Sequence, residues 1–328
     1  MDEKNDFQNL DKFVIASRRN GQPVLRIGFQ MQLYLRGGDD PATRHRTVDV
    51  LADFAKAASR NVTHYQKHMA SRMSPIAGED LSALFHAEVD RLDPATEIYG
   101  PHVGDGQVPP RWQGAALLQS RQAMPVDLSV LHLAMPAMLA KEDPDDLIRR
   151  LVAWCREIQP LHGTAGLAPV YEIGMQQNYP DETWPLLSRF SGLDYMNAFM
   201  LAARGVNRIQ GVNWLTVLGA PMLAEIGGSG KLAGMLDAIS QELAGAEDER
   251  PVLYPYDGGV VIRAGRYPQL GDRNIGGIPK SYRIVNAALR PWLFTDYLNK
   301  PTRLIRVPRP LDAFAETLAW VTRFDGGA

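Results

Sequence analysis

The chain has 328 residues, of which 45% are hydrophobic and 22% charged, so a disordered or fibrous protein is excluded. Its 35 basic and 37 acidic residues give a net charge of -2, which leaves no strongly basic field for general nucleic-acid binding. The single cysteine, Cys155, excludes a disulfide framework and a CxxC redox pair. The N-terminus has no signal-peptide pattern, and no apolar run reaches the ~18 residues of a membrane span. We therefore expect a cytoplasmic protein.

The first predicted elements are a hairpin and a helix. Strict alternation of apolar and polar residues from Leu25 to Leu35 predicts a long strand with one buried face. Asn20-Gly21 is typical of a turn that pairs this strand with residues 13–15. Asp40 and Pro41 supply an N-cap and a first-turn proline, so a helix is predicted after them.

Strands and helices then alternate irregularly along the chain. A helix begins at Asp143 and Pro144 and carries Cys155 on its apolar face, which favours a buried structural thiol over a nucleophile. Further strands are predicted at 114–118, 128–133, 167–171, 212–218, 252–254 and 260–263, and further helices at 231–243 and after Pro279. The last helix is predicted to begin at Pro310, with Leu311, Phe314, Leu318 and Val321 on its apolar face. This order predicts an α+β fold: a mixed, largely antiparallel sheet with packed helices in a single compact unit.

Each nucleotide or metal motif lacks either an essential residue or the structural context that it requires. The run at 226–232 resembles a phosphate loop. It is preceded by Glu225, where the pattern needs its first glycine, and it has Leu232 in place of the magnesium ligand. Gly228, Gly230 and Ala233 satisfy a dinucleotide fingerprint, but no strand is predicted directly before that turn.

The candidate metal motifs are incomplete as well. His64 and His68 have a helical ligand spacing without the glutamate of a zincin, and the other histidines are dispersed. The calcium-loop-like start at Asp272 and Asn274 has Arg283 where the bidentate glutamate belongs. We therefore predict no catalytic residue, no cofactor and no metal.

The stretch from 258 to 285 is the most distinctive in the chain. It contains the pattern AG-x-x-P-x-x-GD-x-N followed by P-x-x-Y-x-x-V, formed by Ala264, Gly265, Pro268, Gly271, Asp272, Asn274, Pro279, Tyr282 and Val285. This pattern resembles the C-terminal signature of a type VI secretion immunity family, formerly a domain of unknown function. That family is associated with effectors carrying nuclease domains of the virus-type replication-repair class. Residues 211–219 and 33–37 resemble its central tryptophan strand and its N-terminal portion.

The resemblance implies an immunity protein that binds one cognate secreted toxin stoichiometrically and needs neither catalytic residues nor a cofactor. It implies an acidic segment with a possible first strand at 1–20, an immunity domain at 21–308, and a packed C-terminal helix at 309–328. Glycine, proline and short polar side chains serve turn geometry, so we expect a structural role for the signature residues. These are Gly265, Pro268, Gly271, Asp272, Asn274 and Tyr282.

An inhibitor of a nuclease can occupy the toxin's electropositive cleft with carboxylates. Acidic candidates are Asp143 with Asp145 and Asp146, Asp181 with Glu182, and residues 247–249, although each set is also typical of a solvated helix start or loop. Trp112, Trp184, Tyr267 and Arg273 lie in loop-like sequence and are candidate anchors. The predicted partner-binding residues are Asp181, Glu182, Trp184, Glu247, Asp248, Glu249, Tyr267 and Arg273.

Two other functions stay open from the sequence. One is a small-molecule enzyme that uses a nucleotide-type cofactor at the turn from Gly227 to Gly230. The other is a structural or scaffolding protein. A copurifying cofactor would favour the enzyme, and a neighbouring toxin gene would favour immunity. The predicted partner is the toxin, with neither nucleic acid nor membrane.

Overall fold

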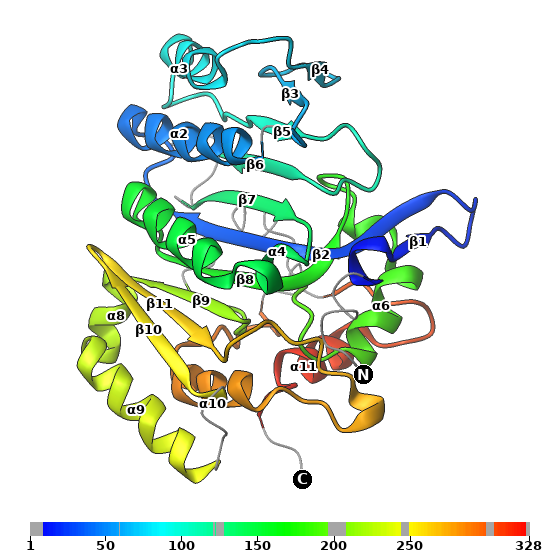
Figure 1. Cartoon of the computed structure of the whole chain (residues 1–328), viewed down its shortest axis with the longest axis vertical. Coiled ribbons are helices and arrows are strands. Elements are labelled where there is room, and N and C mark those ends of the chain that lie inside the picture. Colours follow the sequence, from blue (N-terminus) through cyan, green and yellow to red (C-terminus); the bar gives the residue numbers. More distant parts are fainter. Residues whose placement is uncertain are drawn as a thin grey trace.

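A single sheet of eleven strands crosses the molecule in the computed structural model, which describes residues 9–58, 60–120, 122, 128–195, 208–243, 249–299 and 305–325 (Figure 1). The strand order is β10-β11-β9-β8-β2-β7-β6-β5-β3-β4, and β1 also pairs with β2. The strands are β1 (Val14–Ala16), β2 (Pro23–Leu35), β3 (His64–Gln66), β4 (Ser74–Pro75), β5 (His102–Gly104), β6 (Gln113–Leu117), β7 (Ser129–Met135), β8 (His162–Val170), β9 (Leu215–Gly219), β10 (Pro251–Tyr256) and β11 (Gly259–Ala264). All of these strand pairs are antiparallel, so the predicted α+β class is confirmed.

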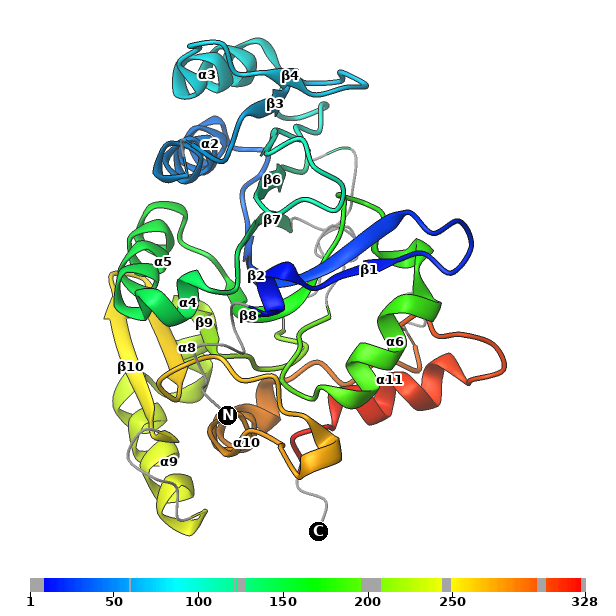
Figure 2. The ribbon, with the colours of Figure 1, turned by 45° about the vertical axis from the view of Figure 1, so that its right-hand side comes forward.

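Helices cover the sheet on both sides. They are α2 (Pro41–Ala57), α3 (Leu81–Arg91), α4 (Leu139–Glu142), α5 (Pro144–Ile158), α6 (Pro180–Arg189), α8 (Ala220–Ile226), α9 (Ser229–Glu242), α10 (Lys280–Leu289) and α11 (Ala313–Val321), with short 3-10 turns η1 (Gln176–Asn178), η3 (Arg273–Ile275) and η4 (Arg290–Trp292). In both ribbon views α2 and α5 lie together on one side, whereas α6 and α11 lie side by side on the other (Figure 2). Trp320 and Val321 of α11 share an apolar cluster with Trp184 and Leu187 of α6.

The central strand β2 is buried on both faces, which corrects the expectation of one buried face. Its apolar side is fully buried, as predicted. On the other side, Gln32 is 2% exposed and Tyr34 is 1% exposed. The Tyr34 hydroxyl donates to Oε1 of Gln32 at 3.1 Å, and Nε2 of Gln30 donates to the carbonyl of Pro169 at 2.9 Å. These polar side chains are satisfied inside the protein, so an alternating pattern did not mean exposure to water.

The predicted starts of the first two long helices are confirmed. Asp40 accepts hydrogen bonds from the backbone N–H groups of Ala42 and Thr43 at the start of α2. Asp143 accepts from the N–H of Asp146 at the start of α5. The Cys155 thiol on α5 is fully buried, and burial raises its pKa, so it is a structural thiol as predicted.

The last helix differs from its prediction. It begins after Asp312, whose carboxylate accepts from the N–H groups of Phe314 and Ala315, and not at Pro310. Its buried residues are Thr317, Trp320 and Val321. Leu311 and Leu318, predicted on the apolar face, are 43% and 36% exposed. The side-chain cap of Asp312 sets the start and therefore the face that packs inward.

Candidate interaction surface

The signature loop joins β11 to α10 and lies against the end of α6. The carbonyl of Gly265 accepts a 3.1 Å hydrogen bond from Nε1 of the buried Trp214. The hydroxyl of Tyr282, also buried, accepts from the N–H of Gln269 at 3.2 Å. The N–H of Ser191 donates to the carbonyl of Gly271 at 2.9 Å. Each of these bonds fixes the path of the loop backbone.

Asp272 joins the same loop to α6. Its carboxylate caps η3 by accepting from the N–H of Asn274 at 3.0 Å. The same carboxylate binds Arg189 through both oxygens, and this ion pair lowers the pKa of Asp272 below its ordinary value. Pro268 is buried and the residue Asn274 is exposed. These contacts support the structural role expected of the signature, which stays a prediction until stability is measured.

The predicted partner-binding residues on α6 lie mostly inside the molecule. Glu182 and Trp184 are each 7% exposed, and Asp181 is half-buried. The Glu182 carboxylate accepts from the N–H of Arg18 at 2.7 Å. Trp184 lies in a helix, so its expected position in a loop is wrong. Both side chains are therefore largely covered by the rest of the protein, and their role in partner binding stays a prediction.

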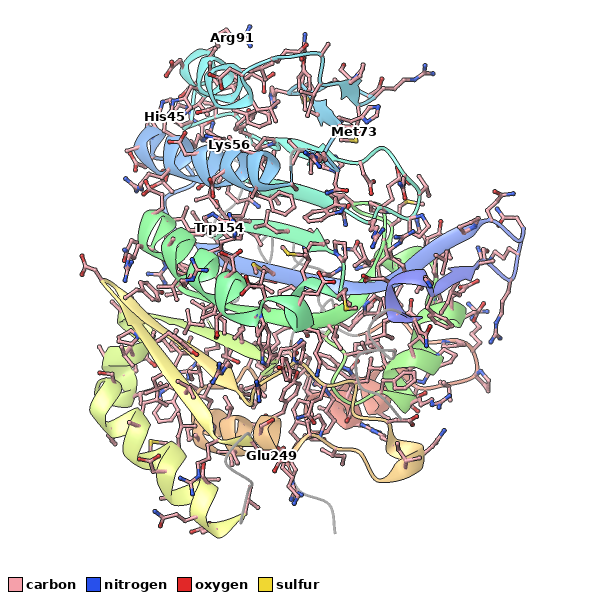
Figure 3. All side chains as sticks on the ribbon, in the orientation of Figure 1. His45, Lys56, Met73, Arg91, Trp154 and Glu249 are labelled. Atoms are coloured by element: carbon pink, nitrogen blue, oxygen red, sulfur yellow. The ribbon has the colours of Figure 1, made fainter. Side chains whose placement is uncertain are left out.

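The other predicted partner residues lie outside α6. Glu247 and Asp248 lie outside the described residues, and Glu249 lies at the end of the molecule away from α3 (Figure 3). Arg273 is exposed in η3. Tyr267 lines a cavity of about 740 Å³ together with Asp143 and Asp145. Lys141, Arg250, Arg263 and Arg266 line this cavity too, and Nζ of Lys141 lies 3.7 Å from the Tyr267 ring centre. The cavity is therefore mixed in charge.

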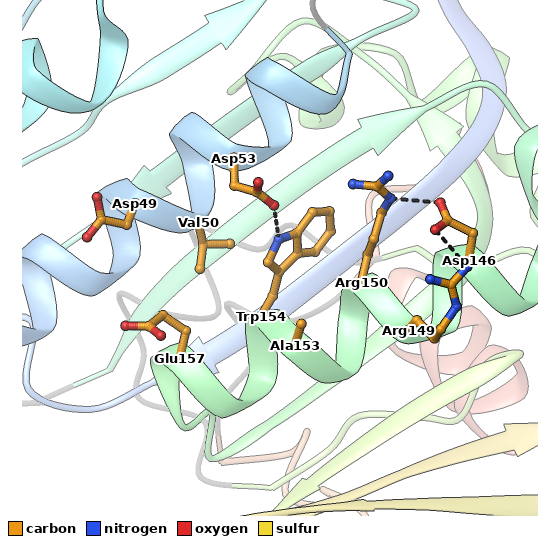
Figure 4. A pocket seen from close by; sticks show the side chains of 9 residues that line it. All are labelled: Asp49, Val50, Asp53, Asp146, Arg149, Arg150, Ala153, Trp154 and Glu157. Carbon is orange, nitrogen blue, oxygen red and sulfur yellow. Dashed lines mark hydrogen bonds and ion pairs between the residues drawn. The ribbon is translucent and has the colours of Figure 1, made fainter.

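A more acidic surface, which the sequence reasoning missed, lies between α2 and α5. Asp49 and Asp53, one turn apart on α2, line a cavity of about 720 Å³ together with Trp154 and Glu157 of α5 (Figure 4). Oδ2 of Asp53 accepts a 2.8 Å hydrogen bond from Nε1 of Trp154. This bond ties the two helices together across the groove.

The acidic surface continues over α2 toward α3. Asp49 and Asp53 also line a second cavity, of about 460 Å³, to which Glu79, Asp80 and Lys56 contribute. The two cavities together are lined by six carboxylates against three basic side chains. We call the two cavities and the helix face between them the α2 groove.

Two of the three bases in the α2 groove share a single carboxylate within α5. Arg149 and Arg150 both bind Asp146, at 3.1 Å and 2.7 Å. One positive charge of this pair of arginines therefore remains beside Lys56, and the lining as a whole has three more acidic than basic side chains. The signal available in the sequence was the four-residue spacing of Asp49 and Asp53, which places both on one side of a helix. No pattern in the neighbouring sequence indicates that this side of the helix faces α5.

The glycine-rich turn from Gly227 to Gly230 joins two helices, α8 and α9. The N–H groups of Gly227 and Gly228 both donate to the carbonyl of Leu223, which ends α8. A dinucleotide site needs a strand that feeds the turn, and a helix stands there. The structural context required by the nucleotide-enzyme alternative is therefore missing.

Neither a metal-binding cluster nor a membrane-spanning helix is found among the described residues. Within them, three or more His, Cys, Asp or Glu side chains do not gather into a group able to hold a metal ion. Among the same residues, none of the helices combines the length and the apolar character needed to span a membrane.

Comparisons with known proteins agree with the signature. The model of a family described as type VI immunity for VRR-NUC, TsiV, matches residues 109–324, which include the whole signature loop. The fold is similar to that of the Pseudomonas aeruginosa T6SS protein PA0821, with a TM-score of 0.78 and 22% identity over 98% of this chain and 90% of that one. No curated protein sequence matches the chain significantly. Since the family model spans more than half of the sequence, the chain belongs to the TsiV family and its function is type VI immunity.

Proposed function

We propose that this immunity protein neutralises one cognate effector nuclease of the VRR-NUC class by direct, stoichiometric binding in the cytoplasm of the producing cell. It performs no catalysis on the toxin and uses no cofactor. The observation that carries the proposal is the α2 groove, which concentrates carboxylates on a protein whose net charge is only -2. A nuclease cleft that binds phosphates is electropositive and attracts such a surface.

The α2 groove is preorganised for a partner. Asp49 and Asp53 project from one rigid helix, and the hydrogen bond from Trp154 fixes the Asp53 side chain before any partner arrives. The Trp154 ring is 5% exposed and packs edge-on against Phe54, so the floor of the groove is rigid. A preorganised surface loses less conformational entropy on binding, which favours tight association.

Protection against an intracellular toxin requires an affinity in the low nanomolar range. That corresponds to about 12 kcal/mol and normally to about 1,600 Å² of buried surface. The groove cannot supply this area by carboxylates alone. The flanking faces of α3 and α5 therefore form the rim of the proposed contact.

The test is a titration of effector nuclease activity with the purified immunity protein. Direct binding predicts that activity falls linearly to zero near one equivalent and that the complex survives gel filtration. A covalently altered toxin, or full protection at a small fraction of one equivalent, would show turnover and refute the proposal. Cytoplasmic action is tested separately, by fractionating producing cells and probing for the untagged chain.

A further inference from the structure

Helices α2 and α3 carry the same five-residue pattern, His-x-x-Val-Asp, from His45 to Asp49 and from His86 to Asp90. The two copies face each other crosswise. Nε2 of His86 lies 2.7 Å from Oδ1 of Asp49, and Nε2 of His45 lies 3.1 Å from Oδ1 of Asp90. Between these two pairs, the Nδ1 atoms of His45 and His86 are 3.0 Å apart. The four side chains thus form a row, Asp49–His86–His45–Asp90, in which Nε2 of each imidazole contacts one carboxylate.

The positions of the hydrogens in this row place two electron-rich nitrogen atoms next to each other at its centre. A carboxylate only accepts, so each Nε2 carries the hydrogen that it donates to Asp49 or Asp90. A neutral imidazole has one N–H, so both Nδ1 atoms then carry bare lone pairs. Two lone pairs 3.0 Å apart repel each other unless a cation lies between them.

We propose that the Nδ1 atoms of His45 and His86 bind one divalent transition-metal ion, which bridges α2 and α3. With metal–nitrogen bonds of about 2.05 Å, two nitrogens 3.0 Å apart subtend an angle of about 94° at the metal. Two imidazole rings bound to one metal ion at this angle have ring centroids about 4.7 Å apart. The observed separation is 4.5 Å, whereas two rings aimed straight at each other would be about 5.3 Å apart.

The surroundings of the two rings fit a metal site. In metalloproteins a ligand histidine almost always donates its second N–H to a carboxylate or carbonyl, which fixes the tautomer and makes the ligand more basic. Asp49 and Asp90 stand in these positions. The histidine side chains are 26% and 35% exposed, so an ion and its waters can reach them.

The chemistry of the donors limits which ion can bind. Two imidazole nitrogens favour nickel, copper or zinc over calcium or magnesium, which prefer oxygen. An angle near 90° suits neighbouring positions of an octahedral or square-planar ion, with water in the other positions. The site has two protein ligands, so it differs from a closed structural site with four. Its expected effect is to tie α3 to α2 at the edge of the α2 groove, where Asp49 lines both cavities.

The test uses the full chain without a histidine tag, titrated with NiCl₂ and then with ZnCl₂ while the melting temperature and the heat of binding are recorded. We expect a rise in melting temperature of a few degrees at saturating Ni²⁺, because the ion binds the folded state alone. His45→Ala and His86→Ala should each abolish the rise. Asp90→Asn should weaken Ni²⁺ binding about tenfold or more, since it removes the carboxylate behind one ligand.

His64→Ala is the matched control, because His64 lies in β3, outside α2 and α3, and its Nδ1 lies 2.9 Å from the Thr63 hydroxyl. This variant should bind Ni²⁺ as the unaltered chain does. Binding should also weaken as the pH falls, because protons compete for the same lone pairs. Absence of any Ni²⁺-dependent rise would show that the two histidines share only a proton. That result, or a rise that persists in His45→Ala and His86→Ala, overturns the proposal.

Discussion

Asp272 and Arg189 form a two-point ion pair that holds the signature loop against the end of α6. Nη2 of Arg189 lies 2.7 Å from Oδ2 of Asp272, and Nε lies 3.2 Å from Oδ1. The two residues are 83 positions apart in the sequence. A planar guanidinium paired with a carboxylate in this way fixes orientation as well as distance. The most distinctive motif of the chain is therefore attached to the body of the protein by its own acidic residue.

Asp272→Ala should lower the melting temperature by a few degrees and leave inhibition of the toxin unchanged. The substitution removes both the η3 cap and the ion pair. Arg189→Ala should have a similar effect, and the double variant should be little worse than either single one. Asp237→Ala, on the exposed face of α9, is the control that should change nothing. Unaltered stability with lost inhibition would show that Asp272 contacts the toxin.

The lowered pKa of Asp272 also predicts how the effect depends on pH. A carboxylate whose pKa is lower in the folded state contributes its stability above the unfolded value of 3.8 and loses it as the pH falls through the folded value. The difference in melting temperature between Asp272→Ala and the unaltered chain should therefore be full at pH 6 and shrink below about pH 3.8. Calorimetric melting curves across this range provide the measurement.

Gly192→Ala should destabilise the protein by about 2–3 kcal/mol through overpacking against the signature loop. An added Cβ would lie 2.0 Å from the backbone carbonyl oxygen of Gln269, and backbone cannot move aside as a flexible side chain can. Gly234→Ala, in α9 with nothing within 4 Å of its Cβ position, should be neutral or stabilising. Urea unfolding compares the two. Equal stability of the two variants would mean that the loop can shift without cost.

Buried histidine predicts a loss of stability in mild acid. Burial lowers the pKa of His132 to about 4, against an ordinary value of 6.5. The unfolded chain takes up a proton at this site between those values and the folded protein does not, so stability falls as the pH drops from 6.5 to 4. The loss approaches about 3 kcal/mol near pH 4. His132→Gln should show a shallower pH dependence in urea unfolding, and an identical slope would contradict this assignment.

Association with the toxin should slow as salt is added. Carboxylates of the α2 groove attract the electropositive cleft over about one Debye length. This length is roughly 10 Å at 0.1 M salt and becomes shorter as salt is added. Raising the salt to 0.5 M should therefore lower the association rate severalfold and change dissociation less. Stopped-flow mixing separates the two rates. An association rate that does not depend on salt would exclude electrostatic steering by this surface.

Local sequence signals predicted most of the secondary structure. The starts of α2 and α5 depend on Asp40 and Asp143, which accept from N–H groups no more than three residues away. The hairpin at Asn20-Gly21 and the buried thiol of Cys155 were predictable for the same reason. The signature motif was recognisable because its glycines, prolines and short polar residues lie within one continuous stretch.

Features that depend on distant residues were not predictable in this way. The second buried face of β2 depends on Gln30 reaching Pro169, 139 positions away. The α2 groove depends on Asp53 meeting Trp154 across 101 positions. A single sequence contains no pattern that pairs such residues, so local composition does not distinguish the acids of α2 from the acidic runs at helix starts. Local composition favours Glu182 and Trp184 as partner-binding residues, whereas both side chains are buried in α6.

Binding of the toxin by the α2 groove is tested by the affinity of Asp49→Asn/Asp53→Asn for the cognate effector, measured by calorimetry or surface plasmon resonance. The variant keeps the shape of the groove and removes two charges from its centre. Asp237→Asn/Glu242→Gln, on the exposed face of α9, removes the same charge elsewhere. We expect binding at least about tenfold weaker for the α2 variant, from lost charge pairing, and unchanged for the α9 control. Equal affinities of the two variants would contradict the claim that the α2 groove binds the toxin.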